Sequence, residues 1–332
     1  MELARIGHDV YFFEPPKASR SLYVLLTQIS AAKRKKKLDA NLSLIEPAFS
    51  PSNKGDVSIK VINKILVRLT AGLLGSLKLD FIIVNNPNFF PILKSIKTPF
   101  AYDHIDDTHL FSNMDREATY SKIAALMDLS VFNIYIHPVA AARDPKGFFL
   151  PNGVDLNEYR PIKAEKLFDA VALSNIAEWF DLDSILDSTK RILLVGPMDL
   201  DSSGNLERYL KSEKTNILWT PEVPKQIANL WVNRAEVGLV PFNEDHPVVS
   251  YAMPLKIIEY FACNIPVVTF KNEGIEELFG EYVTFYSRKF GPDLDTAIDI
   301  AKQTSSNLRA LAKAYAWSKI ARQLDEKIRS VF

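Results

Sequence analysis

The sequence has one cysteine, no net charge and no long uncharged apolar run. Cys263 cannot form an internal disulfide, which permits a reducing compartment. Forty basic and forty acidic residues cancel, so a general nucleic-acid-binding protein is not expected. No apolar run reaches the roughly 18 residues of a membrane-spanning helix, and the first ten residues lack the apolar core of a signal peptide. We therefore expect a cytoplasmic protein.

Several ligand-binding motifs are also missing. No strand-associated G-x-G-x-x-G or G-x-x-x-x-G-K-[ST] is present, which argues against NAD dehydrogenases and nucleoside triphosphatases. The five histidines show no metal-ligand spacing, and a polar loop at a strand end explains His104 and His109 better than a metal does. We expect no metal and no cofactor.

What is present is a regular alternation of short apolar runs and helical segments from residue 80 onward. This alternation predicts an α/β fold with parallel, doubly wound sheets, and 332 residues fit about two domains. The run of cations at 33–37 reads as a solvated loop. Residues 305–330 read as one long amphipathic helix. Strands are expected at 10–13, 40–45, 81–84, 100–102, 129–136, 148–150, 170–173, 192–195, 216–218, 237–240 and 266–269.

The most informative stretch is 254–269, which reads as a helix followed by a buried strand. Pro254 suits a first helical turn, and Pro266 ends the helix. Lys256 and Glu259 are three residues apart and share a helical face. Lysine can hold a phosphate, and glutamate can accept hydrogen bonds from sugar hydroxyls. The alternative is an exposed ion pair without a ligand.

The sequence of this stretch resembles the donor-binding signature of GT-B glycosyltransferases. That signature is P-x-K-x-x-E-Y-x-A-x-x-x-P-V-V, and it follows a strand that ends in V-P-F, here at 240–242. P-N-G-V-D at 151–155 resembles their interdomain linker, especially in family 4. Y-D-H-I-D-D at 102–107 and E-W-F-D at 178–181 are similar to phrases of teichuronic-acid and exopolysaccharide glycosyltransferases.

The resemblance implies two Rossmann-like domains whose parallel sheets face a cleft. An acceptor-binding domain would cover 1–158, joined by a returning C-terminal helix at 315–332, and a nucleotide-sugar-binding domain would cover 159–314. The opening A-R-x-G-H-x-V resembles the start of the second strand in such enzymes. The usual first strand is thus missing, either because the chain is truncated or because another segment takes its place.

The implied activity is transfer of a hexose from a nucleotide diphosphate sugar, UDP-linked in our expectation, to an acceptor hydroxyl in bacterial polysaccharide or glycolipid biosynthesis. Asp106 is the expected general base, as in the xanthan glucuronosyltransferase that this arrangement resembles, with Asp107 as its neighbour; capping of the next helix is the competing role. Tyr251 stands where family 4 has a first glutamate, and the family's basic pair after the first strand of the second domain is missing. The expected donor-binding residues are Lys256, Glu259, Leu255, Pro254, Tyr251, Phe242, Glu222 and Asn175.

One region is basic although the chain is neutral. Residues 33–78 hold ten Lys/Arg and three Asp/Glu. We expect them to contact anionic lipid at the inner face of the membrane, giving access to a lipid-linked saccharide acceptor. Two other functions stay open: a GT-B-like nucleotide-sugar epimerase, and a non-catalytic partner subunit that keeps the fold without the chemistry.

Overall fold

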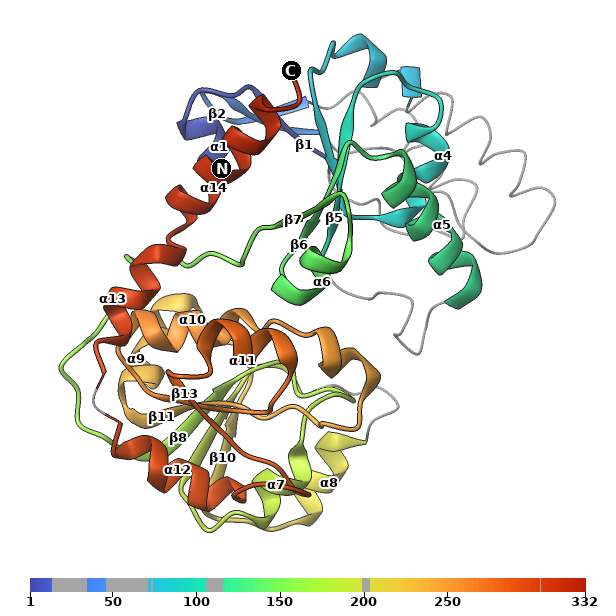
Figure 1. Ribbon diagram of the computed structural model, residues 1–332. Helices are drawn as coiled ribbons and strands as arrows, with labels where there is room; N and C mark the ends of the chain where they lie inside the picture. Colours follow the sequence, from blue (N-terminus) through green and yellow to red (C-terminus); the bar gives the residue numbers. More distant parts are fainter. Residues whose placement is uncertain (14–34, 46–70, 73, 106–115, 199–203, 305) are drawn as a thin grey trace, which may run out of the picture. The chain divides into compact units, whose positions relative to one another are not determined.

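The computed structural model describes residues 1–13, 35–45, 71–72, 74–105, 116–198, 204–304 and 306–332. The chain divides into two compact units (Figure 1). The amino-terminal unit contains Met1–Tyr135, Asp144–Phe148 and Ala321–Phe332, and the carboxy-terminal unit contains Ile136–Arg143 and Phe149–Ile320. Among the described helices, none is both long and apolar enough to cross a membrane.

The carboxy-terminal unit is built on one six-stranded parallel sheet. Its order is β10-β9-β8-β11-β12-β13, the 3-2-1-4-5-6 order of a doubly wound nucleotide-binding fold. The central strands are nearly continuous runs of buried apolar residues, as parallel strands covered on both faces require. The strands are β8 (Phe168–Leu173), β9 (Ile192–Val195), β10 (Ile217–Thr220), β11 (Ala235–Val240), β12 (Val267–Thr269) and β13 (Val283–Phe285).

Helices cover both faces of this sheet (Figure 1). One face carries α7 (Leu182–Asp187), α8 (Asn205–Lys211) and α12 (Leu294–Lys302). The other carries α9 (Lys225–Asn233), α10 (Leu255–Ala262) and α11 (Glu273–Phe279), with the 3-10 turn η3 (Pro247–Tyr251) before α10. The predicted helix–strand alternation of this half is confirmed.

The amino-terminal unit contains two smaller sheets, β1-β3-β2 and β4-β5-β6-β7. The strands β1 and β4 belong to different sheets. The strands are β1 (Val10–Phe13), β2 (Lys35–Asp39), β3 (Leu42–Ile45), β4 (Ile82–Val84), β5 (Phe100–His104), β6 (Phe132–Tyr135) and β7 (Gly147–Phe149). The helices and turns are α1 (Glu2–Arg5), η1 (Pro87–Phe89), α4 (Phe90–Leu93), α5 (Arg116–Leu129) and α6 (Pro138–Arg143), the last grouped with the other unit.

One expectation for this unit is wrong. The cation run was predicted as a loop, yet its described part begins β2, which pairs antiparallel with β3. Lys36 and Lys37 are exposed on this edge strand. Lysines on an edge strand discourage pairing with another chain, which is a structural reason for their presence.

The predicted continuous helix at 305–330 is also wrong. The tail consists of α13 (Leu308–Ala312), the turn η4 (Lys313–Tyr315) and α14 (Trp317–Arg329), separated by Ala316, whose backbone is extended. Ala316 forms a parallel bridge with Val154, whose N–H donates to Tyr315 O at 2.8 Å. The linker strand thus interrupts a sequence whose apolar spacing alone would continue as a helix.

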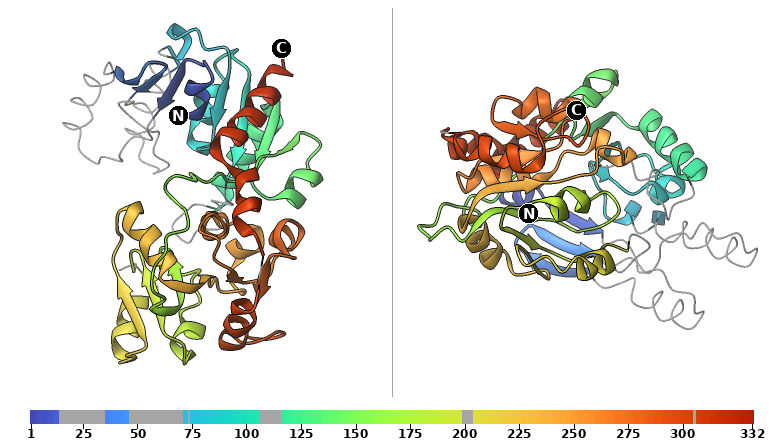
Figure 2. Two further views of the ribbon diagram at one scale, coloured as in Figure 1. Left: turned by 90° about the vertical axis from the view of Figure 1, so that its left-hand side faces the viewer. Right: turned by 90° about the horizontal axis from the view of Figure 1, so that it is seen from below.

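The end of α14 packs in the amino-terminal unit, as predicted for the returning helix (Figures 1 and 2). Its Lys327 ammonium lies 5.2 Å from the ring of Phe132 and 5.7 Å from that of Phe148. Asp325 Oδ1 is 2.7 Å from His8 Nε2. Cation–π contacts and this polar pair therefore fix the last helix against β6, β7 and the start of the chain.

Candidate functional site

The strand order of the carboxy-terminal unit changes direction between β8 and β11. In open α/β sheets, ligands bind beyond the carboxyl ends of the strands at such a switch point. Ser174 and Asn175 follow β8 directly, and Pro241 and Phe242 follow β11. Asn175 is exposed, whereas Phe242 is half-buried and stacks on Phe270 at 5.3 Å between ring centroids. Two predicted donor-binding residues therefore flank the switch point.

The backbones at the ends of β8 and β9 approach each other closely. Gly196 after β9 has φ +139°, and a Cβ there would lie 2.0 Å from Ser174 O. Only glycine fits this position, because any side chain would meet backbone and because the backbone lies in the left-handed region. This contact fixes the main chain of Ser174 beside the switch point.

The pair at the start of α10 forms as its spacing predicts. Lys256 Nζ lies 2.7 Å from Glu259 Oε2. The pair is not the exposed surface bridge of the alternative interpretation, since the Glu259 side chain is 7% exposed and that of Lys256 33%. A carboxylate this buried requires charged or hydrogen-bonding partners. The pair therefore combines a buried carboxylate with a lysine side chain that is one-third exposed.

Tyr159 of the linker is a further partner of Glu259 that the sequence did not indicate. Burial, and then the neighbouring Glu259 charge and a hydrogen bond with that carboxylate, raise the pKa of Tyr159. The side chain is buried at 4% exposure, and its phenol therefore remains a neutral donor. The only hint in the sequence was that Tyr159 follows the P-N-G-V-D phrase.

Two asparagines fix the loop that leads into α10. Asn272 donates to Val249 O at 3.0 Å and to Ala252 O at 2.8 Å, and Asn152 donates to Met253 O at 3.0 Å. The loop contains Tyr251, which is 42% exposed. Its backbone carbonyls are thus held by the side chains of the α11 N-cap residue and of the linker, which orients the first turn of α10.

The other predicted donor-binding residues lie at the same edge of the sheet. Pro254 is the N-cap of α10, has extended backbone and forms no side-chain cap hydrogen bond, and Leu255 is the first helical residue. Glu222 is exposed and follows β10, at the far end of the strand order from β13. The structure thus brings Lys256 into contact with Glu259 but places Glu222 behind a different strand, and the role of these residues in donor binding stays a prediction.

A polar cavity of about 160 Å³ lies next to α7 and α8, on the face of the sheet opposite to α10. None of the predicted donor-binding residues lines it. Its charged groups already have partners: Arg208 pairs with Asp183, and Tyr286 donates to Asp181 at 3.1 Å. Asp181 also caps α7 by accepting from Ser184 N at 3.1 Å. The segment Glu178–Asp181 therefore stabilises the face of the sheet that carries α7 and α8, and we assign the cavity no ligand.

In the amino-terminal unit, the expected bases Asp106 and Asp107 lie outside the described residues. Asp103 of the same phrase is described, half-buried at the end of β5. Burial raises its pKa to about 6, against a smaller lowering by His104. The His104 ring lies 5.3 Å from that of Tyr135. Asp103 is thus a carboxyl group near a parallel strand end whose pKa is raised by burial.

Comparisons with known proteins agree with this architecture. Residues 178–291 match the family model of glycosyl transferases group 1, a segment within the carboxy-terminal unit. No curated protein sequence matched the chain. Among solved structures, sucrose-phosphate synthase from Thermosynechococcus elongatus has a TM-score of 0.75 at 14% identity, covering 100% of this chain and 91% of that one.

Two further structures are similar over nearly the whole chain. HepE from Anabaena, solved in complex with UDP and glucose, has a TM-score of 0.69 at 14% identity and covers 97% of this chain and 100% of its own. Trehalose 6-phosphate synthase from Burkholderia multivorans has a TM-score of 0.65 at 13% identity, with 97% and 91% covered. The chain has the GT-B fold of these structures, and residues 178–291 are similar to group 1 glycosyl transferases, which confirms the predicted resemblance; the finer subtype stays a prediction.

Among the described residues, no group of three or more His, Cys, Asp or Glu side chains is placed to hold a metal ion.

Proposed function

We propose that this protein binds a nucleotide diphosphate sugar at the switch point of the carboxy-terminal unit and transfers the sugar to an acceptor hydroxyl. The observation that carries the proposal is the buried Glu259 with its partly exposed Lys256, inside the segment that matches group 1 glycosyl transferases. A diphosphate is already a good leaving group, so such a protein mainly positions the substrates and stabilises the departing charge.

The two charged residues would divide the donor between them. Glu259, held by Lys256 and Tyr159, presents a carboxylate that can accept from both ribose hydroxyls. Lys256 would turn its ammonium toward the diphosphate, where it supplies a point charge. Backbone N–H groups after β8 and at the first turn of α10 would complete the phosphate contacts, as helix starts do for anions.

The base that accepts the acceptor proton would come from the phrase at 102–107. We keep Asp106 as the first choice and Asp107 as its neighbour. Asp103 joins them as a candidate, because a group with a pKa near the working pH is the most effective general base.

We further propose a hexose donor, a lipid-linked saccharide acceptor in bacterial polysaccharide or glycolipid biosynthesis, and contact of residues 33–78 with anionic lipid at the inner membrane face. The exposed Lys36 and Lys37 on β2 support the membrane contact.

The experiment is a release assay. The protein is incubated with each of a panel of UDP-, GDP- and dTDP-hexoses, with and without a membrane lipid extract, and free nucleoside diphosphate is measured. Acceptor-dependent release that disappears in Glu259→Gln supports transfer. Conversion of the sugar without any acceptor points to the epimerase, and binding of no nucleotide sugar points to the partner subunit.

A further inference from the structure

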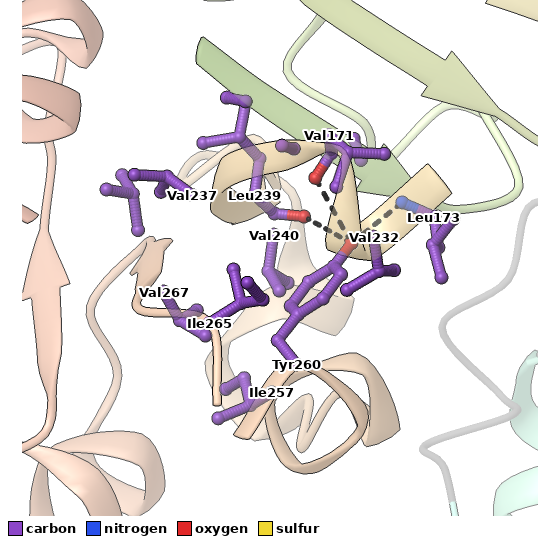
Figure 3. Packing of buried hydrophobic residues seen from close by; sticks show 14 of the residues in the cluster. Val171, Leu173, Val232, Val237, Leu239, Val240, Ile257, Tyr260, Ile265 and Val267 are labelled. Atoms are coloured by element: carbon purple, nitrogen blue, oxygen red, sulfur yellow. Dashed lines mark hydrogen bonds between the residues drawn. The ribbon is translucent and has the colours of Figure 1, made fainter. Parts of the chain in front are cut away.

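Tyr260 of α10 is completely buried between β8 and β11, next to the proposed donor-binding Glu259. Figure 3 shows its ring directed from the helix toward the two strands, with the hydroxyl among three backbone groups. The apolar periodicity of the helix explains a buried aromatic ring here, but it does not explain the hydroxyl.

The two central strands part at this point. The described pairing of β8 with β11 joins Phe168 to Ala235, Ala170 to Val237 and Val171 to Gly238, and goes no further. Each strand nevertheless stays paired with its outer neighbour to its last residue, Leu173 with Val195 of β9 and Val240 with Thr269 of β12. Both strands therefore remain extended and separate only from each other.

The missing hydrogen bond of this ladder can be named. Continuing the register by two residues would pair Leu173 with Val240, and in that parallel ladder Leu173 N–H would donate to Leu239 O. The following bond would need an N–H from Pro241, which has none. The ladder is thus weakened beyond this point by the sequence itself.

The hydroxyl of Tyr260 stands in place of the missing bond. Leu173 N–H donates to Tyr260 Oη at 2.8 Å, and Oη lies 3.2 Å from Leu239 O and 3.3 Å from Val171 O (Figure 3). A phenol both accepts and donates, so it joins the two groups that would otherwise bond to each other directly. Burial raises the pKa of Tyr260 well above its usual value, so the donated proton is retained.

The sequence makes room for this arrangement at one glycine. A Cβ on Gly238 would lie 2.4 Å from the Tyr260 ring, so the ring lies directly on the backbone of β11. Any larger residue would displace the ring and the hydroxyl with it.

We propose that Tyr260 is a positioning residue for the donor site: its hydroxyl holds the ends of β8 and β11 apart at the switch point and anchors the turn of α10 that carries Glu259. This inference rests on the proposed function for its ligand. The separation keeps Asn175 and Phe242, which follow the two strands, on either side of the nucleotide. Tyr260 thus sets the spacing between the two strand ends, and Glu259, the residue before it, contacts the ligand.

The test uses Tyr260→Phe in the full chain, with Tyr209→Phe as matched control. Tyr209 lies on α8 of the same unit, and its hydroxyl donates to Ile217 O of β10 at 3.1 Å. Affinity for UDP is measured by calorimetry well below the unfolding temperature. We expect Tyr260→Phe to weaken UDP binding roughly ten-fold, the scale of one well-placed hydrogen bond, and Tyr209→Phe to leave it unchanged. Unchanged affinity in Tyr260→Phe overturns the proposal.

A second variant excludes a loss of fold as the cause. Replacing Tyr260 with 4-aminophenylalanine keeps a group that donates and accepts, so UDP affinity should return to within about two-fold of wild type. If Tyr260→Phe does not fold, 4-fluorophenylalanine is measured instead, since it fills the volume without donating; wild-type affinity in that variant overturns the proposal.

A crystal structure of Tyr260→Phe separates this inference from the proposed function. If the hydroxyl holds the strands apart, Leu173 N and Leu239 O should approach to about 3 Å and bond directly. An unchanged separation refutes the spacing role even if UDP binds. Failure of the wild-type protein to bind UDP or any other nucleotide refutes the proposed function. The role of Tyr260 in separating the strands is then tested by the crystal structure of Tyr260→Phe alone.

Discussion

Replacing Lys256 with alanine separates the two roles of the α10 pair. The ammonium lies 2.7 Å from Glu259 Oε2 and the Lys256 side chain is one-third exposed, so the residue has a protein partner and is partly open to solvent. A hydrogen bond to a charged group contributes about 1.5–3 kcal/mol, which corresponds to roughly a 10–150-fold loss of affinity for a nucleoside diphosphate.

The same substitution leaves Glu259 buried with Tyr159 but without a cation. Removing one partner of a fully buried pair costs about 3–5 kcal/mol, and an exposed pair contributes under about 1 kcal/mol. Because Lys256 is partly exposed, we expect a loss of about 1–2 kcal/mol in the free energy of unfolding. Lys211→Ala, which breaks an exposed pair with Glu207 on α8, is the control and should change neither quantity by more than about 0.5 kcal/mol.

The assay compares UDP with uridine by calorimetry. Uridine has the ribose but no phosphate, so Lys256→Ala should weaken UDP binding strongly and uridine binding little. Glu259→Gln should weaken the binding of both ligands, since the contacts proposed for Glu259 are with the ribose. The reasoning is refuted if Lys256→Ala binds UDP as the wild type does, or if it weakens both ligands equally.

Three further predictions concern the amino-terminal unit. Asp106→Asn should reduce turnover about 10²–10⁴-fold while its affinity for UDP stays normal. If Asp106→Asn stays active and Asp107→Asn does not, Asp107 is the base. If both variants stay active, the two aspartates have a structural role. Burial raises the pKa of Asp103 to about 6, so its contribution to stability is complete below about pH 4 and is lost as the pH rises through about 6. In urea unfolding, Asp103→Asn should therefore match wild type near pH 4 and exceed it by about 1–3 kcal/mol at about pH 7.5; a constant difference contradicts this. Lys36→Glu with Lys37→Glu should reduce flotation with anionic vesicles at low salt, and salt-insensitive recovery equal to wild type counts against membrane contact.

The sequence predicted five of the six strands described in the carboxy-terminal unit, because parallel strands buried on both faces read as short apolar runs, but it missed β13. It also placed Lys256 and Glu259 on one helical face, and their contact is confirmed. It could not predict how deeply Glu259 is buried, because burial depends on Tyr159, a hundred residues earlier in the chain.

The errors have a common physical cause in long-range pairing. The tail breaks at Ala316 because Val154 of the linker bonds to both sides of it, and no local signal such as proline marks the break. Residues 35–37 join a sheet because β3 offers them a partner. The role of the Tyr260 hydroxyl depends on Leu173 and Leu239, which helical periodicity does not bring together.

The central claim, that the carboxy-terminal unit binds a nucleotide diphosphate sugar, is tested most directly by thermal unfolding of the wild-type protein with a panel of nucleotides. A ligand at a hundred times its dissociation constant adds about 2.7 kcal/mol, which raises the unfolding temperature by roughly 4–7 °C for a unit or chain of this size. We expect such a rise for one nucleoside diphosphate and its sugar conjugates, and little rise in Lys256→Ala. No rise with any nucleotide in the wild-type protein would contradict it.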